Sequence, residues 1–202
     1  MSWLNYTRRL KAKDMVPTPW MVAMALQADG WYLRQDIIWA KPNPMPESVT
    51  DRCTKAHEYL FLLTKRERYY WDANAVKEAG VEQPRAKEGG AGESAVQRKS
   101  RGFDNCMGTT GTRNRRSVWT VATQPYAGAH FAVMPEALVE PCILAGSRHG
   151  DLVLDPFCGS GTVMRVAYRY GRRGVGCDIN GAYLDLAGER TQVTLGLPLE
   201  LA

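Results

Sequence analysis

The sequence predicts an α/β fold, and three observations in its last third support this prediction. Leu152–Leu154 is a short apolar run that ends in an acid, which is typical of a buried parallel strand. A Gly-x-Gly turn at Gly159 and Gly161 follows, and it opens an amphipathic helix at about Thr162. Arg173–Cys177 favours a second strand. Strand, helix and strand together predict a right-handed βαβ unit.

Two acids make this unit suitable for a nucleoside ligand. Asp155 ends the first strand, and Asp178 ends the second strand 23 residues later. At about this separation, nucleoside-binding units keep the carboxylate that holds the ribose hydroxyls. Glycines between the acids let the backbone approach a ligand, and the helix start offers N–H groups. A tight turn with no ligand explains the spacing equally well, so spacing alone leaves both interpretations open.

The remaining elements follow in chain order from local signals. Thr18 as N-cap and Pro19 in the first turn predict a helix that continues through Gln27 and stops at Gly30. Apolar and aromatic runs predict strands, and proline or asparagine begins two later helices. The strands are Asp36–Ala40, Glu58–Thr64 and Tyr69–Trp71, and the helices are Pro135–Ala145 and Asn180–Gln192. Pro141 either kinks its helix or marks the place where the regular helix begins.

The letters of the glycine turn are more specific than its spacing. Asp-Pro-Phe-Cys-Gly-Ser-Gly-Thr at 155–162, with Ile179-Asn180 after the second acid, resembles the S-adenosylmethionine motif of the DNA amino-methyltransferases. These enzymes modify adenine N6 or cytosine N4. The segments 36–46 with 57–65, and 117–119 with 130–135, are similar to further parts of that family. Outside about 73 to 114, the resemblance covers most of the chain.

This resemblance implies a Rossmann-like S-adenosylmethionine-dependent methyltransferase fold in the permuted order, in which the catalytic motif precedes the cofactor motif. It implies S-adenosylmethionine as cofactor and double-stranded DNA as partner. Asp178 is then the expected ribose ligand, although helix capping remains an alternative for it. The expected cofactor contacts are Asp155, Pro156, Phe157, Gly159, Gly161, Thr162, Asp178, Asn180, His130 and Phe131.

The family's catalytic tetrapeptide, Asp/Asn/Ser-Pro-Pro-aromatic, has no counterpart here, because the 202 residues contain no Pro-Pro pair. Gln124-Pro125-Tyr126 lies in the wrong place and lacks the hydrogen-bond acceptor. We therefore name no catalytic residue. We expect an N-terminally incomplete enzyme that is inactive alone, with its catalytic strand missing or on another chain, and an unpaired edge along Leu152–Leu154. The alternatives are a non-catalytic DNA-binding remnant and an NAD-binding protein, against which the missing Gly-x-Gly-x-x-Gly counts.

Charge and composition divide the chain into three parts. Between 84 and 116 eight basic residues face three acidic ones, a local surplus that equals the net charge of +5 of the whole chain. Residues 73–116 are therefore the expected basic target-recognition insert, between a first core part at 1–72 and a cofactor-binding part at 117–202. Positive charge attracts phosphates. The expected DNA contacts are Arg113, Arg115, Arg116 and Lys41, although a merely solvated insertion explains the same charge.

Other classes of protein find little support in the sequence. The five cysteines form no Cys-x-x-Cys pair and lie at no zinc-ligand spacing from histidine, so we expect no metal. There is no signal-peptide pattern and no run of about 18 apolar residues, which favours a cytoplasmic enzyme.

Overall fold

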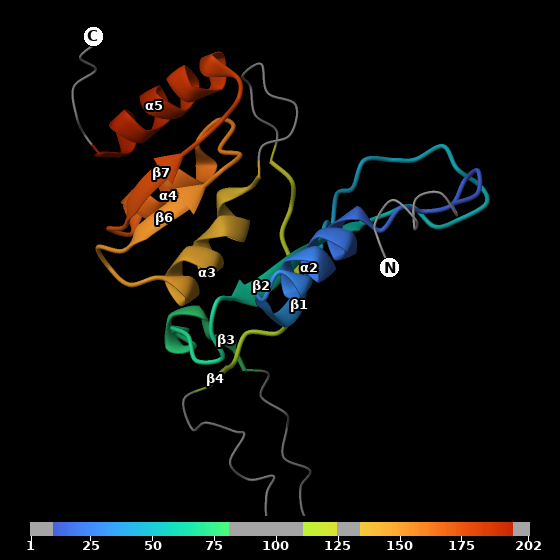
Figure 1. Ribbon diagram of the computed structural model, residues 1–202, viewed down its shortest axis with the longest axis horizontal. Helices are drawn as coiled ribbons and strands as arrows, with labels where there is room; N and C mark the ends of the chain where they lie inside the picture. The colour runs from blue at the N-terminus through green and yellow to red at the C-terminus, as the bar shows by residue number, and fades with distance from the viewer. Residues whose placement is uncertain (1–9, 81–110, 125–133, 196–202) are drawn as a thin grey trace, which may run out of the picture.

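The computed structural model describes residues 10–80, 111–124 and 134–195, with side chains through residue 191 (Figure 1). Within these ranges it has an α/β fold, as predicted. The elements are α2 (Thr18–Ala28), β1 (Tyr32–Ala40), β2 (His57–Thr64), η1 (Asn74–Val76), β3 (Glu78–Ala79), β4 (Thr112–Arg113), β5 (Val118–Thr120), α3 (Glu136–Gly146), β6 (Leu152–Asp155), α4 (Thr162–Arg169), β7 (Arg173–Gly176) and α5 (Gly181–Leu195).

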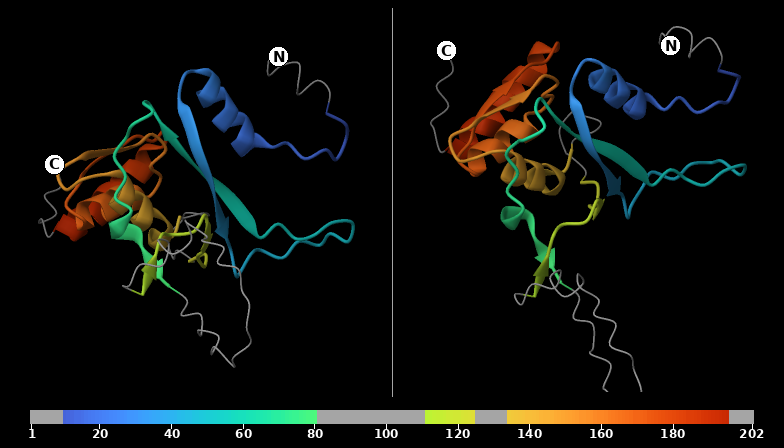
Figure 2. Two further views of the ribbon diagram at one scale, coloured as in Figure 1. Left: turned by 90° about the horizontal axis from the view of Figure 1, so that it is seen from below. Right: turned by 60° about the horizontal axis from the view of Figure 1, so that its bottom comes forward.

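The first sheet has the strand order β2-β1-β5. Its central strand β1 pairs antiparallel with β2, so that Ile38 lies opposite Tyr59, and parallel with β5, so that Ile38 also lies opposite Val118. The loop of residues 41–56 that joins β1 to β2 extends away from β6 and β7 (Figure 2). The predicted strands Asp36–Ala40 and Glu58–Thr64 are therefore confirmed, although β1 begins four residues earlier and β2 one residue earlier than predicted.

Helices cover both faces of this sheet. On one face, the α2 indole of Trp20 makes edge contacts with Tyr59 at 5.6 Å and with Phe61 at 4.9 Å between ring centroids. On the other face, Leu138 of α3 is buried in a cluster with Ile37, Trp39 and Trp119. The sheet is therefore packed by buried apolar side chains on its α3 side and by aromatic ring contacts on its α2 side.

The predicted βαβ unit is confirmed as β6, α4 and β7. The two strands are parallel, and Leu154 lies opposite Val175. Helix α4 lies very close to β7, because a Cβ added at Gly174 would come within 2.9 Å of the Met164 side chain, and one at Gly176 within 2.6 Å. Glycine at both positions is what lets the helix approach the strand.

Helix α3 connects the two sheets, which share no hydrogen bonds among the described residues. Besides its contact with the first sheet, α3 packs Val139 and Ile143 against Val166 and Ala167 of α4, with Val153 of β6 beside them. Figure 1 shows α3 between β1–β2 and β6–β7. The helix therefore covers one face of each sheet.

Several predicted boundaries and one predicted strand are wrong. Tyr69–Trp71 forms no strand, since its rings serve other contacts: the Arg148 guanidinium lies 4.2 Å from the Tyr70 ring centroid. Helix α3 runs through a buried Pro141 and begins at Glu136, not near the proline. Packing on both sides of α3 compensates for the hydrogen bond that proline cannot donate. Thr18 is the first residue of its helix and not the N-cap, which is Pro17.

A short antiparallel ladder joins the two sides of the predicted insert. Strand β3 pairs with β4, Glu78 lies opposite Arg113, and the Gly80 N–H donates to the Gly111 oxygen at 2.7 Å. We call residues 78–80 with 111–113 the stem. It brings into contact chain positions that are 31 to 35 apart. In the part of the chain that the structure describes, no helix has the length and apolar character needed to span a membrane.

Candidate cofactor site at the ends of β6 and β7

The turn after β6 is shaped by its first acid. Asp155 Oδ1 accepts a hydrogen bond of 3.0 Å from the Phe157 N–H, which closes the turn over Pro156. The chain then passes through Gly159 at φ 49°, in the left-handed region that favours glycine. Helix α4 begins at the buried Thr162. The acid at position 155 therefore shapes this loop through a main-chain hydrogen bond.

Asp178 links the ends of the two strands. One carboxylate oxygen accepts a hydrogen bond of 2.9 Å from the Gly159 N–H, and the other accepts one of 2.9 Å from the Asn180 N–H. Asn180 Oδ1 in turn accepts from the Ala182 N–H at the start of α5. The first turn of α5 is thus served by Asn180, while Asp178 positions the glycine loop.

Helix α5 supports the loop from behind, which the sequence did not predict. Gly161, at φ 79°, lies against this helix, because a Cβ added there would come within 2.8 Å of the Ala187 Cβ. The Arg190 guanidinium donates to the Ser160 main-chain oxygen at 2.7 Å and also to the Ser160 hydroxyl. Gly161 is therefore required for the packing of the loop against this helix. The small residue at 187 was the only sequence signal for this contact.

Two large apolar side chains lie exposed where the strands end. Phe157 follows β6 and is 87% exposed, and Ile179 follows β7 and is 105% exposed. In open parallel sheets, ligands bind in the crevice beyond the carboxyl ends of the strands. Phe157 was among the predicted cofactor contacts, whereas Ile179 was noted only as part of the motif. Its place directly after Asp178 was the signal that could have identified it.

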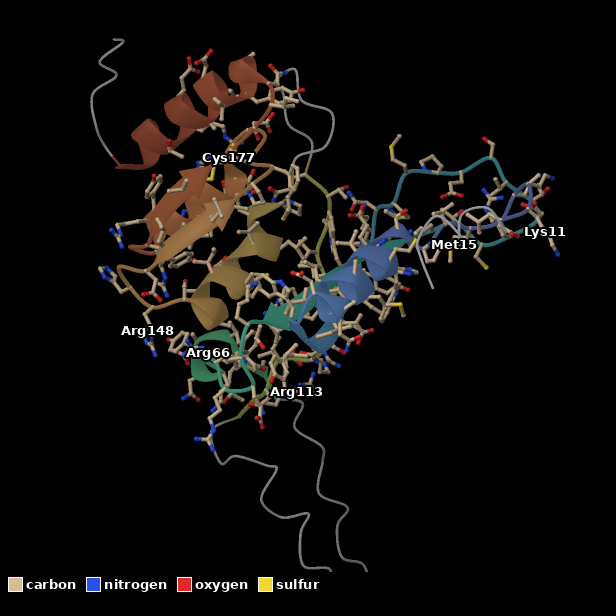
Figure 3. All side chains as sticks on the ribbon, in the orientation of Figure 1. Lys11, Met15, Arg66, Arg113, Arg148 and Cys177 are labelled. Atoms are coloured by element: carbon tan, nitrogen blue, oxygen red, sulfur yellow. The ribbon has the colours of Figure 1, made fainter. Side chains whose placement is uncertain are left out.

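A buried thiol lies beneath this loop. The Cys158 N–H donates to the Cys177 oxygen at 2.9 Å, which fastens the glycine loop to the end of β7. Burial raises the pKa of the Cys158 thiol, and the nearby Asp155 and Asp178 carboxylates raise it further. The thiol therefore remains protonated near neutral pH. Cys177 is exposed beside the loop (Figure 3).

The predicted DNA contacts lie elsewhere and have partners within the protein. Arg113 and Arg116 both donate to Glu78 Oε1, at 2.8 and 2.7 Å, in the stem. These two arginines lower the pKa of Glu78, although desolvation alone would raise it. Arg115 lies over the Trp119 ring, 4.5 Å from its centroid. Arg116 keeps a side chain that is 67% exposed.

Lys41 also has internal partners. It forms an ion pair with Glu58, and its ammonium lies 4.5 Å from the Trp39 ring centroid. Figure 3 shows Arg113 on the side of the molecule away from Cys177, so the stem and the glycine loop are separate regions. His130 and Phe131, predicted at the methionine end of the cofactor, lie outside the described residues.

Fold and site define a class. The site lies in a parallel βαβ unit with a left-handed glycine turn. It has an acid at each strand end and exposed apolar side chains beside these acids, which is the architecture of a nucleoside-binding α/β protein.

Comparison with known protein families identifies the family. A family model described as DNA methylase, for N6 and N4 methyltransferases, matches residues 2–189, and the chain belongs to this family.

Named relatives agree with this assignment. The chain is 50% identical over 183 residues to the type II methyltransferase M.Cfr9I of Citrobacter freundii, a match that covers 91% of this chain and 52% of the relative. It is 47% identical over 181 residues to M.SmaI of Serratia marcescens, covering 90% of this chain and 53% of that protein. The chain thus spans about half the length of these relatives.

Solved structures share the fold. The PvuII DNA methyltransferase, described as cytosine-N4-specific, superposes with a TM-score of 0.63 at 18% identity, over 95% of this chain and 62% of that one. The M1.HpyAVI complex with S-adenosylmethionine gives a TM-score of 0.60 at 19% identity, over 88% of this chain and 71% of that one. These likenesses confirm the Rossmann-like methyltransferase fold.

Proposed function

We propose that this chain is the cofactor-binding part of a DNA methyltransferase that transfers a methyl group from S-adenosylmethionine to the exocyclic amine of cytosine or adenine. The observation that carries the proposal is the placement of two acids at the carboxyl ends of the parallel strands β6 and β7, where Asp155 closes the turn and Asp178 positions the glycine loop. Family membership supports the same function, and the two named relatives are type II methyltransferases.

The residues present suit S-adenosylmethionine. Asp178 is placed to accept from ribose hydroxyls, and the exposed Phe157 and Ile179 offer apolar surface for an adenine ring. Gly159 carries no side chain in the turn, and the start of α4 contributes N–H groups. When bound, the cofactor supplies an electrophilic methyl group on a sulfonium. The chain's own part is to bind and orient that group and to keep it beside the strand ends.

The acceptor amine needs groups that this chain does not contain. Its lone pair is delocalised into the base, so such enzymes flip the base out, accept hydrogen bonds from the amine and stack an aromatic ring on the base. In the family a Pro-Pro-aromatic tetrapeptide does this, and the printed residues hold no Pro-Pro pair. We propose that the 202 residues alone bind the cofactor without methylating DNA, and that a second polypeptide segment supplies catalysis.

We also propose that DNA is contacted from the stem side, where the Arg116 side chain is 67% exposed and that of Arg113 is 33% exposed. Arg116 shares the Glu78 carboxylate with Arg113, Arg115 lies over the Trp119 ring and Lys41 pairs with Glu58, so all four have a partner within the protein. A titration of the purified chain into DNA at several salt concentrations tests this. Arg116→Ala is expected to reduce the log-log salt slope by about one unit for a lost phosphate contact. An unchanged slope would remove Arg116 from the interface.

Cofactor binding is tested by calorimetric titration of S-adenosylmethionine into the chain. Asp178→Ala is expected to weaken binding by roughly 1.5 to 3 kcal/mol, the range for a hydrogen bond to a charged group. Asp151→Ala is the matched control, because its carboxylate bonds the Arg148 N–H at the other end of β6. NAD is the control ligand and is expected not to bind. Equal affinity in the Asp178 variant, or preference for NAD, would contradict the proposal.

A further inference from the structure

Basic and aromatic side chains gather around the segment that leaves β2, residues 65–70. Two rings of this segment lie under guanidinium groups from other elements. Arg34 of β1 is 5.6 Å from the Tyr69 ring centroid, and Arg148, between α3 and β6, is 4.2 Å from that of Tyr70. The segment thus brings together five exposed basic residues, which we call the basic patch: Arg34, Lys65, Arg66, Arg68 and Arg148.

The charges of the basic patch are not taken up by carboxylates. Within the part of the chain that the structure describes, none of its five side chains is in an ion pair. The stem differs, because its two arginines share Glu78. Glu67 is an exposed acid within the segment, while the carboxylates of Asp72 and Asp151 accept from main-chain N–H groups. The patch therefore offers cationic groups to an external anion.

The chemistry of the patch suits phosphate groups. A guanidinium that is stacked on a ring still presents its planar N–H edge, which matches the geometry of phosphate. Stacking also restricts the side chain before binding, so that less rotational freedom is lost on contact. Duplex DNA carries one charge per about 1.7 Å of its axis and engages several such cations at once. Basic residues gathered on one face are the electrostatic footprint of nucleic-acid binding.

The patch lies far from the glycine loop. Arg148 precedes β6 and the loop follows it, and a strand of this length spans about 13 Å. Figure 3 shows Arg66 and Arg148 on the side of the molecule away from Cys177. At about 3.4 Å per base-pair step, this distance corresponds to about four steps of a duplex. The patch is therefore suited to phosphates that flank a target base at the loop, not to those of the target nucleotide.

We infer that the basic patch is a second DNA-backbone site, separate from the stem, that holds the duplex beside the target. This inference rests on the proposed function, in which DNA is the substrate. The contact is made to phosphates and carries no information on base sequence. It contributes to the affinity for DNA and to the dependence of that affinity on salt.

The test is fluorescence anisotropy across a salt series, with a labelled duplex of about 30 base pairs that includes flanks on both sides of any target. Arg66→Ala combined with Arg148→Ala is expected to flatten the log-log salt slope by about two units, one for each lost phosphate contact. The matched control is Lys11→Ala combined with Arg52→Ala. It removes the same charge from exposed positions, and Figure 3 shows Lys11 at the far end of the molecule from Arg148. The control is expected to leave the slope unchanged.

Two further measurements make the result decisive. Arg148→Lys keeps the charge and should keep the slope, whereas a purely structural role of the Arg148–Tyr70 contact would make it behave as the alanine variant does. All variants should bind S-adenosylmethionine as the unaltered chain does, which excludes misfolding. Failure of the unaltered chain to bind this cofactor counts against the proposed function and leaves the salt slopes to be judged alone.

Three outcomes would overturn the inference. One is equal slopes in the patch variant and the unaltered chain, and another is equal flattening in the patch and control variants. The third uses polyglutamate as a competing probe. Binding of polyglutamate as tight as that of the duplex, lost in the patch variant, would assign the surface to an acidic protein partner instead of DNA.

Discussion

Replacing Gly161 by alanine tests how α5 supports the glycine loop. Gly161 is at φ 79°, where a side chain costs about 1 to 2 kcal/mol. The added Cβ would also come within 2.8 Å of the Ala187 Cβ and 3.0 Å of its Cα, and overpacking of this kind costs about 1 to 3 kcal/mol. We therefore expect Gly161→Ala to lower the free energy of unfolding by about 2 to 5 kcal/mol.

The matched control is Gly150→Ala. Gly150 has a similar φ of 84°, but a Cβ there would meet nothing within 4 Å. Urea unfolding of this variant should show the conformational cost alone, about 1 to 2 kcal/mol. A double-mutant cycle with Ala187→Gly should recover part of the additional cost of Gly161→Ala. Equal destabilisation by the two glycine variants would refute the packing argument.

Three further predictions concern the stem, the thiols and the loop. The pKa of Glu78 is lowered, so its ion pairs are complete above the ordinary carboxyl pKa and are lost as pH falls through the lowered value. The protection of the Gly80 amide, measured as its exchange rate relative to the intrinsic rate at the same pH, should therefore fall in acid, and Glu78→Gln should remove that fall. Iodoacetamide should modify exposed Cys177 much faster than buried Cys158, and S-adenosylmethionine should protect Cys177. Arg190→Ala should weaken cofactor binding by about tenfold in calorimetry, with partial recovery in Arg190→Lys.

The βαβ unit could be predicted because its signals are local. Strand β6, the glycine turn and β7 are each specified by a few neighbouring letters, and the two acids mark the strand ends. The amphipathic pattern of residues 162–169 predicts the helix α4 between the two strands. Local pattern was enough here, since the unit's own residues make most of the contacts that define it.

The rest depended on contacts between residues far apart in the chain. Nothing near Arg113 or Arg116 indicates that Glu78, more than thirty positions earlier, accepts from both. The aromatic content of 69–71 is typical of a strand, but Tyr70 instead lies under Arg148. The support that Arg190 gives the loop from α5 is equally non-local. Tertiary contacts decided each of these cases.

The central claim is that S-adenosylmethionine binds at the carboxyl ends of β6 and β7. Ultraviolet crosslinking of labelled S-adenosylmethionine to the chain, followed by peptide mapping, tests it most directly. Label is expected on the peptides that contain Phe157 and Ile179, the two exposed apolar residues that flank the site. Label confined to other peptides, with binding intact, would place the cofactor elsewhere and contradict the account.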